Sequence, residues 1–199
     1  MKVAIVDYGA GNIQSLRFAL DRLGVESVLT ANPEVLRRAD KVIFPGVGEA
    51  SSAMKKLRAT GLDTLLPTLK QPVLGICLGM QLMCNSTAEG NTQGLGIFDC
   101  EVQRFPTKVK VPQMGWNTLS ATKGALFENI VANEYMYLVH SYYAPLIEET
   151  IAATTYGETY STALQKDNFY GVQFHPEKSS KAGSQLLSNF LALWELFQP

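Results

Sequence analysis

Cys77 is the first residue whose surroundings suggest chemistry, because it lies in Gly75-Ile76-Cys77-Leu78-Gly79, between an apolar segment and a helical one. Glycines two residues on either side of a nucleophile are typical of a tight strand-to-helix turn, where side chains at those positions would collide. The helix that follows would place Cys77 near its N-terminus, where the dipole and free N–H groups favour a thiolate. The spacing predicts a cysteine nucleophile; a buried structural cysteine on a glycine-rich turn is the alternative.

A cysteine nucleophile needs a base, and the chain has two histidines. His175 precedes Pro176, and proline favours extended backbone for the residue before it. Alternate side chains of an extended segment project to the same side, so Glu177 can orient the His175 imidazole and stabilise its charged form. His140 has no acid within two residues, and we expect it to be structural. The predicted catalytic residues are Cys77, His175 and Glu177; a surface turn with an incidental histidine is the alternative.

The segment Phe44-Pro45-Gly46-Val47-Gly48 follows a third apolar run. A Gly-x-Gly loop at the carboxyl end of a parallel strand can present backbone N–H groups to a developing oxyanion. The N–H of the residue after the nucleophile is the usual second donor. We therefore predict oxyanion donors at Val47, Gly48 and Leu78, with an ordinary glycine turn as the alternative.

Another glycine-rich segment, Asp7-Tyr8-Gly9-Ala10-Gly11, resembles the start of a dinucleotide-binding fingerprint. The third glycine of that fingerprint is missing, because position 14 is Gln14, and no clear ribose-binding acid follows near Asn32. The sequence also lacks the ligand spacings of a structural zinc site. We therefore predict no cofactor and no metal.

The elements that must position these residues change in type along the chain. Apolar runs separated by helical patterns in the first half predict a parallel sheet covered on both faces. Expected strands there are 2–7, 26–29, 41–44 and 73–76, and expected helices are 13–23, 51–60 (capped by Ser51 or Ser52) and about 79–84. Short segments rich in Thr, Tyr and Val predict antiparallel strands at 101–105, 135–139, 151–156, 161–165 and 169–174. A last helix is expected at 180–197.

The predicted fold class is α/β, with a mostly parallel central sheet flanked by helices and antiparallel strands added in the second half. Composition is that of a globular protein, with 46% hydrophobic and 18% charged residues. We expect one domain, residues 1–199. Basic residues are scattered and the net charge is −1, so neither nucleic acid nor a membrane is an expected partner. The segments expected of a signal peptide or a membrane span are missing, and the three cysteines show no CxxC spacing, so reduced thiols in the cytoplasm are expected.

Taken together, three motifs resemble those of class I (triad-type) glutamine amidotransferases: Pro45-Gly46-Val47-Gly48, Gly75-Ile76-Cys77-Leu78-Gly79-Met80-Gln81 and His175-Pro176-Glu177. Two further stretches, 7–12 and Pro112-Gln113-Met114-Gly115-Trp116-Asn117, are similar to signatures of the glutaminase subunits of imidazole glycerol phosphate synthase. The resemblance runs from Lys2 to the C-terminal helix. It implies a flavodoxin-like fold and a place in histidine biosynthesis.

This resemblance implies that Cys77 attacks the side-chain amide of L-glutamine, that His175 moves the proton and that Glu177 orients His175. It implies a heterodimer with a (β/α)₈-barrel cyclase subunit, which receives the ammonia and makes imidazole glycerol phosphate and aminoimidazole carboxamide ribotide. The residues expected to hold glutamine are Gly46, Gln81, Glu89, Ser141 and Tyr142, with Glu89 facing the α-ammonium. Those expected to face the partner are Met114, Trp116, Asn117 and Lys178.

Two other functions stay open from the sequence. One is a glutaminase subunit that serves pyridoxal phosphate or anthranilate synthesis, against which the segment 114–117 argues. The other is a catalytically silent scaffold that binds a partner. The presence of Cys77, His175 and Glu177 together argues against that second reading.

Overall fold

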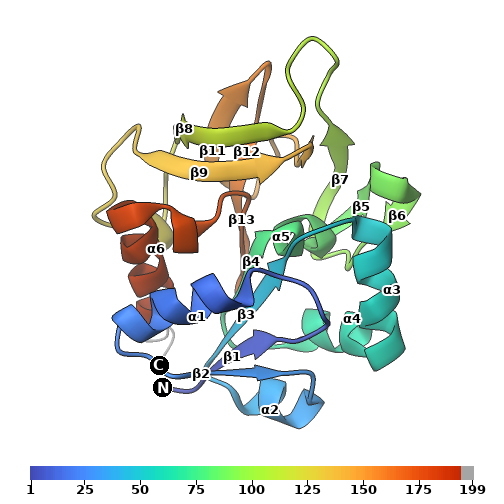
Figure 1. The fold of residues 1–199 in the computed structure, drawn as a ribbon, viewed down its shortest axis with the longest axis vertical. Coiled ribbons are helices and arrows are strands. Elements are labelled where there is room, and N and C mark those ends of the chain that lie inside the picture. Colours follow the sequence, from blue (N-terminus) through green and yellow to red (C-terminus); the bar gives the residue numbers. More distant parts are fainter. Residues whose placement is uncertain (194–199) are drawn as a thin grey trace.

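A seven-stranded sheet forms the centre of the computed structural model, which describes residues 1–193 (Figure 1). The strand order is β11-β12-β13-β4-β3-β1-β2. Every pair from β13 to β2 is parallel, whereas β11 pairs antiparallel with β12 and β12 with β13. The strands are β1 (Val3–Val6), β2 (Ser27–Thr30), β3 (Lys41–Gly46), β4 (Val73–Cys77), β11 (Thr150–Tyr156), β12 (Glu158–Lys166) and β13 (Phe169–Val172). The predicted α/β class is confirmed.

Helices cover both faces of this sheet. Alternate residues of one strand enter different cores: Val3 and Ile5 pack with α1 and α6, whereas Ala4 and Val6 pack with α2, α3 and α4. Because successive strand side chains point to opposite faces, this division shows a sheet buried on both sides. The helices are α1 (Ile13–Arg22), α2 (Pro33–Arg38), α3 (Ala50–Thr60), α4 (Leu62–Leu65), α5 (Leu78–Met83) and α6 (Ser180–Ala192).

Two smaller sheets stand beside the central one. A four-stranded sheet has the order β10-β7-β5-β6, and β8 pairs with β9 in an antiparallel ribbon. Their strands are β5 (Cys84–Thr87), β6 (Thr92–Gln93), β7 (Phe98–Arg104), β8 (Gln113–Thr118), β9 (Tyr135–His140) and β10 (Tyr142–Tyr143). The Tyr137 carbonyl accepts a hydrogen bond from the backbone of His175, so β9 passes beside the carboxyl end of β13.

Some local expectations were wrong. Segment 169–174 was expected to be antiparallel, but β13 is parallel to β4 and antiparallel only to β12. Helix α3 is capped by Glu49, not by Ser51 or Ser52, because the Glu49 carboxylate accepts hydrogen bonds from both serine N–H groups. Its expected end at Gly61 is confirmed by a left-handed φ of 70°.

The last helix, expected to reach Phe197, is described to Ala192, and its remaining residues from 194 lie outside the described part of the chain. Strands β5, β6, β8 and β10 and helices α2 and α4 were not expected. Within residues 1–193, none of the helices has the length and apolar character needed to cross a membrane.

Candidate active site

The strained turn predicted around Cys77 is present. Cys77 is the last residue of β4, and α5 begins at the next residue. Its φ of 55° and ψ of −112° lie outside the usual regions for a residue with a side chain. The flanking glycines are needed there, because a Cβ at Gly79 would overlap the Phe44 carbonyl oxygen and one at Gly75 would overlap the Met83 sulfur.

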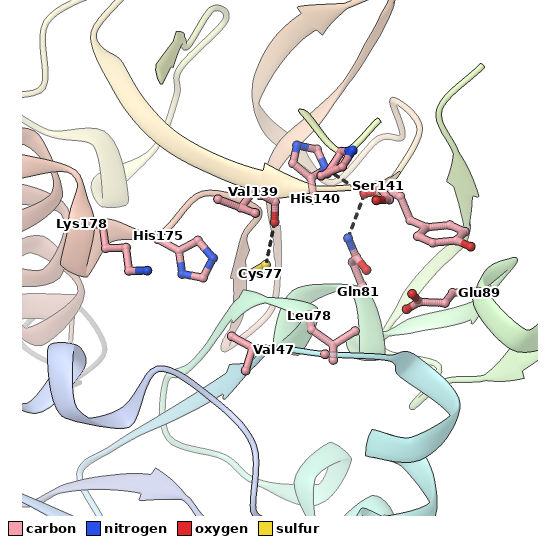
Figure 2. A pocket seen from close by; sticks show the side chains of 13 residues that line it. Val47, Cys77, Leu78, Gln81, Glu89, Val139, His140, Ser141, His175 and Lys178 are labelled. Carbon is pink, nitrogen blue, oxygen red and sulfur yellow. Dashed lines mark hydrogen bonds between the residues drawn. The ribbon is translucent and has the colours of Figure 1, made fainter. Parts of the chain in front are cut away.

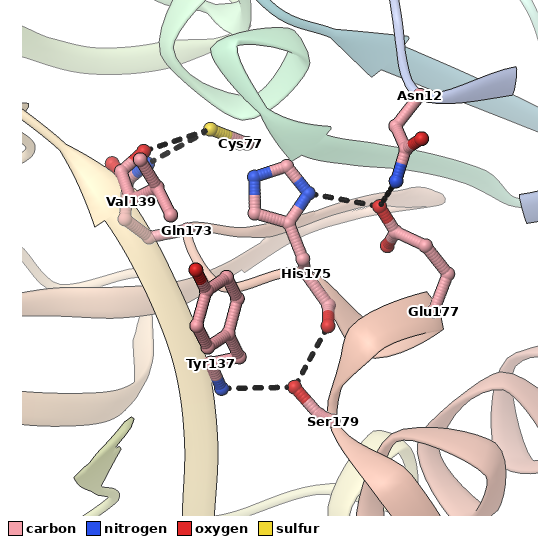
Figure 3. Close-up of polar contacts among 8 residues, drawn as sticks. All are labelled: Asn12, Cys77, Tyr137, Val139, Gln173, His175, Glu177 and Ser179. Atoms are coloured by element: carbon pink, nitrogen blue, oxygen red, sulfur yellow. Dashed lines mark hydrogen bonds and ion pairs between the residues drawn. The ribbon is translucent and has the colours of Figure 1, made fainter. Parts of the chain in front are cut away.

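His175 lies between Cys77 and Glu177, as Figure 3 shows. Its Nδ1 is 2.9 Å from Glu177 Oε1, and the Glu177 side chain is only 2% exposed. Burial by itself would lower the pKa of His175, but hydrogen bonds and charge from Cys77 and Glu177 outweigh it and raise that pKa to about 10. The site therefore stabilises an imidazolium beside the sulfur.

The backbone around His175 is held from the neighbouring ribbon. The Ser179 hydroxyl donates to the His175 carbonyl at 2.7 Å and accepts from the Tyr137 N–H at 3.0 Å. These two bonds, drawn in Figure 3, tie the turn after β13 to β9. The orientation of the imidazole thus depends on strand β9, which is distant in sequence.

The glycine loop after β3 reaches the same site. Gly48 has a φ of +98°, which favours glycine, and nothing lies within 4 Å of a Cβ built there. Tyr8 donates its hydroxyl proton to the Pro45 carbonyl at 2.9 Å. Burial and the neighbouring Cys77 raise the pKa of Tyr8 well above its usual range, so it remains a donor.

A cavity of about 380 Å³ opens beside Cys77 (Figure 2). Its lining includes every predicted oxyanion residue and all but one of the predicted glutamine-binding residues. The lining residues are Val47, Gly48, Cys77, Leu78, Gln81, Glu89, Pro112, Val139, His140, Ser141, Tyr142, His175 and Lys178.

Gly46 is the residue that the structure does not bring into this cavity. It pairs with Cys77 across β3 and β4. A Cβ at Gly46 would come within 2.6 Å of the Gly79 nitrogen and 2.8 Å of the Tyr8 hydroxyl. Gly46 therefore permits the close approach of β3 to α5, and its expected contact with glutamine is not supported by its position.

Gln81 lines the cavity with its amide nitrogen already engaged. Its Nε2 donates to the Tyr142 carbonyl at 2.9 Å and to Gln173 Oε1 at 2.8 Å. Gln173 in turn donates to the Cys77 sulfur at 3.7 Å. Sequence reasoning missed Gln173, although it lies two residues before His175 in an extended segment and so projects to the same side.

Glu89 lies on the far side of Gln81 from Cys77 in Figure 2. Its Oε2 accepts a hydrogen bond from the Ala50 N–H at 2.9 Å. Burial, with a contribution from the charge of Glu49, raises the pKa of the Glu89 carboxyl. A cation bound in the cavity would offset that burial, so Glu89 is suited to an ammonium group.

His140 is in a different environment, although it also reaches the cavity wall. Its Nδ1 donates to the Tyr142 carbonyl at 2.8 Å, and its Nε2 lies 3.1 Å from the Tyr160 hydroxyl. Burial lowers the pKa of His140 to about 4. A neutral imidazole with a polar partner beside each ring nitrogen agrees with the expected structural role.

The residues expected to face a partner lie on the ribbon and beside the cavity mouth. On β8, Met114 is 66% exposed and Trp116 is 51% exposed. Trp116 packs edge-on against Tyr137, whose ring also lies 6.0 Å from the Lys178 ammonium. Asn117 differs from these residues, because its amide donates to the Thr155 carbonyl and accepts from the Thr118 N–H.

Asn12 is a further residue that the sequence did not reveal. Its Nδ2 donates to Glu177 Oε1 at 3.1 Å, across 165 residues of sequence. The available signals were its place in the signature stretch 7–12 and its position directly before a predicted helix, which normally indicates a helix cap.

The model of the family described as glutamine amidotransferase class-I matches residues 4–194, and the chain belongs to this family. The chain is similar to the protein named imidazole glycerol phosphate synthase subunit HisH in several bacteria. That of Bacteroides thetaiotaomicron is 58% identical over 196 residues, which cover 97% of this chain and 100% of that protein. That of Yersinia pseudotuberculosis is 46% identical over 196 residues, with the same coverage.

Solved structures share the fold at lower identity. A glutamine amidotransferase has a TM-score of 0.74 at 19% identity and covers 96% of this chain and 97% of its own. The PurLQS structure from Thermotoga maritima has a TM-score of 0.72 at 14% identity, with 97% and 98% covered. Residues 1–193 therefore carry the class-I amidotransferase fold.

Proposed function

We propose that this chain is the glutaminase subunit of an imidazole glycerol phosphate synthase and hydrolyses L-glutamine for histidine biosynthesis. The observation that carries the proposal is the Nδ1–Oε1 contact of 2.9 Å between His175 and Glu177, on an imidazole that faces the Cys77 turn. Similarity over nearly the whole chain to proteins named as subunits of that synthase supports the choice of pathway. We further propose that residues 1–199 form one amidotransferase domain that acts in the cytoplasm.

In the proposed reaction, the Cys77 sulfur attacks the carbon of the side-chain amide and forms a tetrahedral intermediate. The imidazolium of His175 gives its proton to the amide nitrogen, ammonia leaves and a glutamyl thioester remains. Water, deprotonated by His175, then attacks the thioester carbonyl and releases glutamate with the free thiol. Glu177 orients the imidazole and stabilises its positive charge throughout.

The negative charge of the tetrahedral intermediate needs donors close to Cys77. Leu78 is the first residue of α5, where backbone N–H groups have no partner within the helix. Val47 and Gly48 line the same cavity, and Val47 lies on the same side of Cys77 as Leu78 in Figure 2. We propose that the N–H groups of these three residues supply the oxyanion donors, each loss of which typically costs about 10²–10³ in rate.

The substrate would extend from Cys77 towards Glu89. The Glu89 carboxylate would pair with the α-ammonium of glutamine, since its burial disfavours an unpaired charge. Ser141, Tyr142 and the remaining amide oxygen of Gln81 would form polar contacts along the way. This orientation places the side-chain amide of glutamine, and not its α-carboxylate, at the sulfur.

Ammonia formed at Cys77 requires an acceptor protein. We propose a heterodimer with a (β/α)₈-barrel cyclase subunit, docked on the exposed Met114 and Trp116 of β8 and on Lys178. Exposed large apolar side chains grouped beside a cavity mouth are typical of a protein interface. The engaged amide of Asn117 suits a role in shaping β8 more than direct contact.

The test separates ammonia production from ammonia use. In the assembled synthase, Cys77→Ala should abolish glutamine-dependent synthesis and leave ammonium-dependent synthesis nearly intact, because added ammonium replaces the product of this chain. The measurement is formation of imidazole glycerol phosphate with each nitrogen source. If the assembled variant also fails with excess ammonium, the proposed division of labour is wrong. Product formed only with a pyridoxal phosphate or anthranilate synthase partner would favour the other glutaminase.

A further inference from the structure

Helix α1 begins at an asparagine that does not cap it. Asn12 is the N-cap residue of α1, and its side chain makes no hydrogen bond to the first turn of that helix. Asn32, the N-cap of α2, shows the usual arrangement, since its Oδ1 accepts from the Glu34 and Val35 N–H groups. A capping side chain normally stabilises its helix, so something else must use the Asn12 amide.

That use is the carboxylate of Glu177, as Figure 3 shows. Asn12 Nδ2 donates to Glu177 Oε1 at 3.1 Å, and the same oxygen contacts His175 Nδ1 at 2.9 Å. An ionised carboxylate only accepts hydrogen bonds, so the amide nitrogen and not the amide oxygen must face it. Two donors therefore converge on one oxygen.

The other carboxylate oxygen contributes no restraint. Glu177 Oε2 is buried and has no hydrogen-bond partner among the described residues. Rotation about the last side-chain bond of glutamate is broad and roughly two-fold. A single bond to His175 would therefore leave the carboxylate plane poorly defined, and the second bond from Asn12 fixes it.

We propose that Asn12 is a positioning residue that holds the Glu177 carboxylate against His175 and gives up the capping of its own helix to do so. This inference rests on the proposed function, because it assigns a purpose to the triad acid. It also gives a role to the glycine-rich segment 7–12 that follows β1. The segment brings α1 up to the turn Pro176–Lys178, with the positive end of the helix dipole beside the carboxylate.

Two substitutions separate positioning from capping. Asn12→Ala removes the donor and should lower kcat for glutamine hydrolysis by ~10-fold or more, as loss of a hydrogen bond to a charged group does. KM should change little, because Asn12 is not among the residues that line the glutamine cavity. Asn12→Asp should lower kcat further, since it places a second carboxylate against Glu177.

A capping role predicts the opposite order, because aspartate caps helices as well as asparagine does and alanine does not. The matched control is Asn32→Ala, which should lower the midpoint of denaturant unfolding and leave kcat unchanged. All variants are measured as full chains assembled with the cyclase subunit. If Asn12→Asp is as active as the unaltered chain, or more active than Asn12→Ala, the inference is overturned.

Glu177→Gln distinguishes this failure from failure of the proposed function. Unchanged turnover in Glu177→Gln would contradict the assignment of Glu177 to the proposed catalytic triad. A large loss in Glu177→Gln together with full activity in Asn12→Asp would overturn only the role of Asn12. In the Glu177→Gln background, Asn12→Ala should add little further loss, because two residues that act through one contact are not additive. A full independent loss there would also contradict the inference.

Discussion

The two histidines of the chain are both buried, yet their surroundings give them opposite properties. His175 faces a carboxylate and a thiol, and its pKa is raised to about 10. His140 faces a carbonyl, a phenol and the ring of Phe105, and its pKa is lowered to about 4. Burial disfavours the charged form of both, so the difference comes from the partners.

This contrast shows that burial does not by itself decide the pKa of a histidine. The Cys77 sulfur and the Glu177 carboxylate are together close enough to His175 to outweigh the cost of burying a cation. Among residues 1–193 no carboxylate forms a hydrogen bond or ion pair with His140, whose hydrogen bonds serve instead to fix the strand that forms the cavity wall. The contrast predicts that substitution of His175 lowers turnover, whereas substitution of His140 lowers stability.

The largest effect should come from removing the base. His175→Gln should lower the turnover of glutamine by about 10⁴-fold or more, because proton transfer and stabilisation of the sulfur are lost together. His140→Gln should retain most of the turnover and unfold at lower denaturant. The measurements are steady-state hydrolysis and equilibrium unfolding of each variant. Comparable loss of turnover in both would remove the distinction.

Both histidines should contribute to the dependence of the free energy of unfolding on pH, His140 on its acid limb and His175 on its alkaline limb. The folded-state pKa of His140 is below its unfolded value of about 6.5, so stability is lost as pH falls from 6.5 towards 4. The folded-state pKa of His175 is above that value, so its contribution is present below pH 6.5 and lost as pH rises towards 10. The acid limb should amount to about 3 kcal/mol and the alkaline limb to about 5 kcal/mol.

Single variants test this assignment. His140→Gln should flatten the acid limb alone, and His175→Gln should flatten the alkaline limb alone. The measurement is the free energy of unfolding by denaturant between pH 4 and 10. If each variant flattens the other limb, or if neither limb changes, the proposed environments of the two histidines are wrong.

A smaller effect should follow from the phenol beside His140. The Tyr160 hydroxyl lies 3.1 Å from His140 Nε2 and donates to Gln113 Oε1 at 2.8 Å. Tyr160→Phe leaves these buried atoms unsatisfied and should cost about 1–3 kcal/mol of stability, with little change in kcat. Tyr143→Phe is the matched control, because the Tyr143 hydroxyl forms a less buried hydrogen bond, to Gln103 at 3.2 Å. An equal cost in both would argue against a special role for Tyr160.

The smallest effect concerns the exposed cation next to the triad. Lys178→Glu should weaken binding of the cyclase subunit and its coupling to glutamine hydrolysis. The effect should be small, because an exposed ion pair is worth only about 0–1 kcal/mol. Folding should be unchanged, since Lys178 makes no ion pair within the described residues. Titration of the partner at two salt concentrations measures the effect. Unaltered assembly and coupling would place the interface elsewhere.

Much of the site could be predicted because each of its main motifs lies within a few consecutive residues. The glycines around Cys77 are required by the turn itself, and His175 with Glu177 follows from alternation in an extended segment. The position of Val47 and Gly48 beside Cys77 could be predicted from the meeting of parallel strand ends at one edge, and their role as oxyanion donors stays a prediction. By contrast, Asn12 and Gln173 were missed, since each acts on a residue more than ninety positions away in sequence.

The sequence by itself determined the tight turn at Cys77, the contact of His175 with Glu177 and the parallel core, because each depends on spacing within one or two elements. Only the tertiary structure decided what surrounds them. It placed the asparagine before α1 on Glu177, turned β13 parallel to β4, and withdrew Gly46 from the cavity into the contact between β3 and α5. It also set the pKa of His175, because that pKa depends on Cys77, which the folded chain brings to the imidazole from a distant segment.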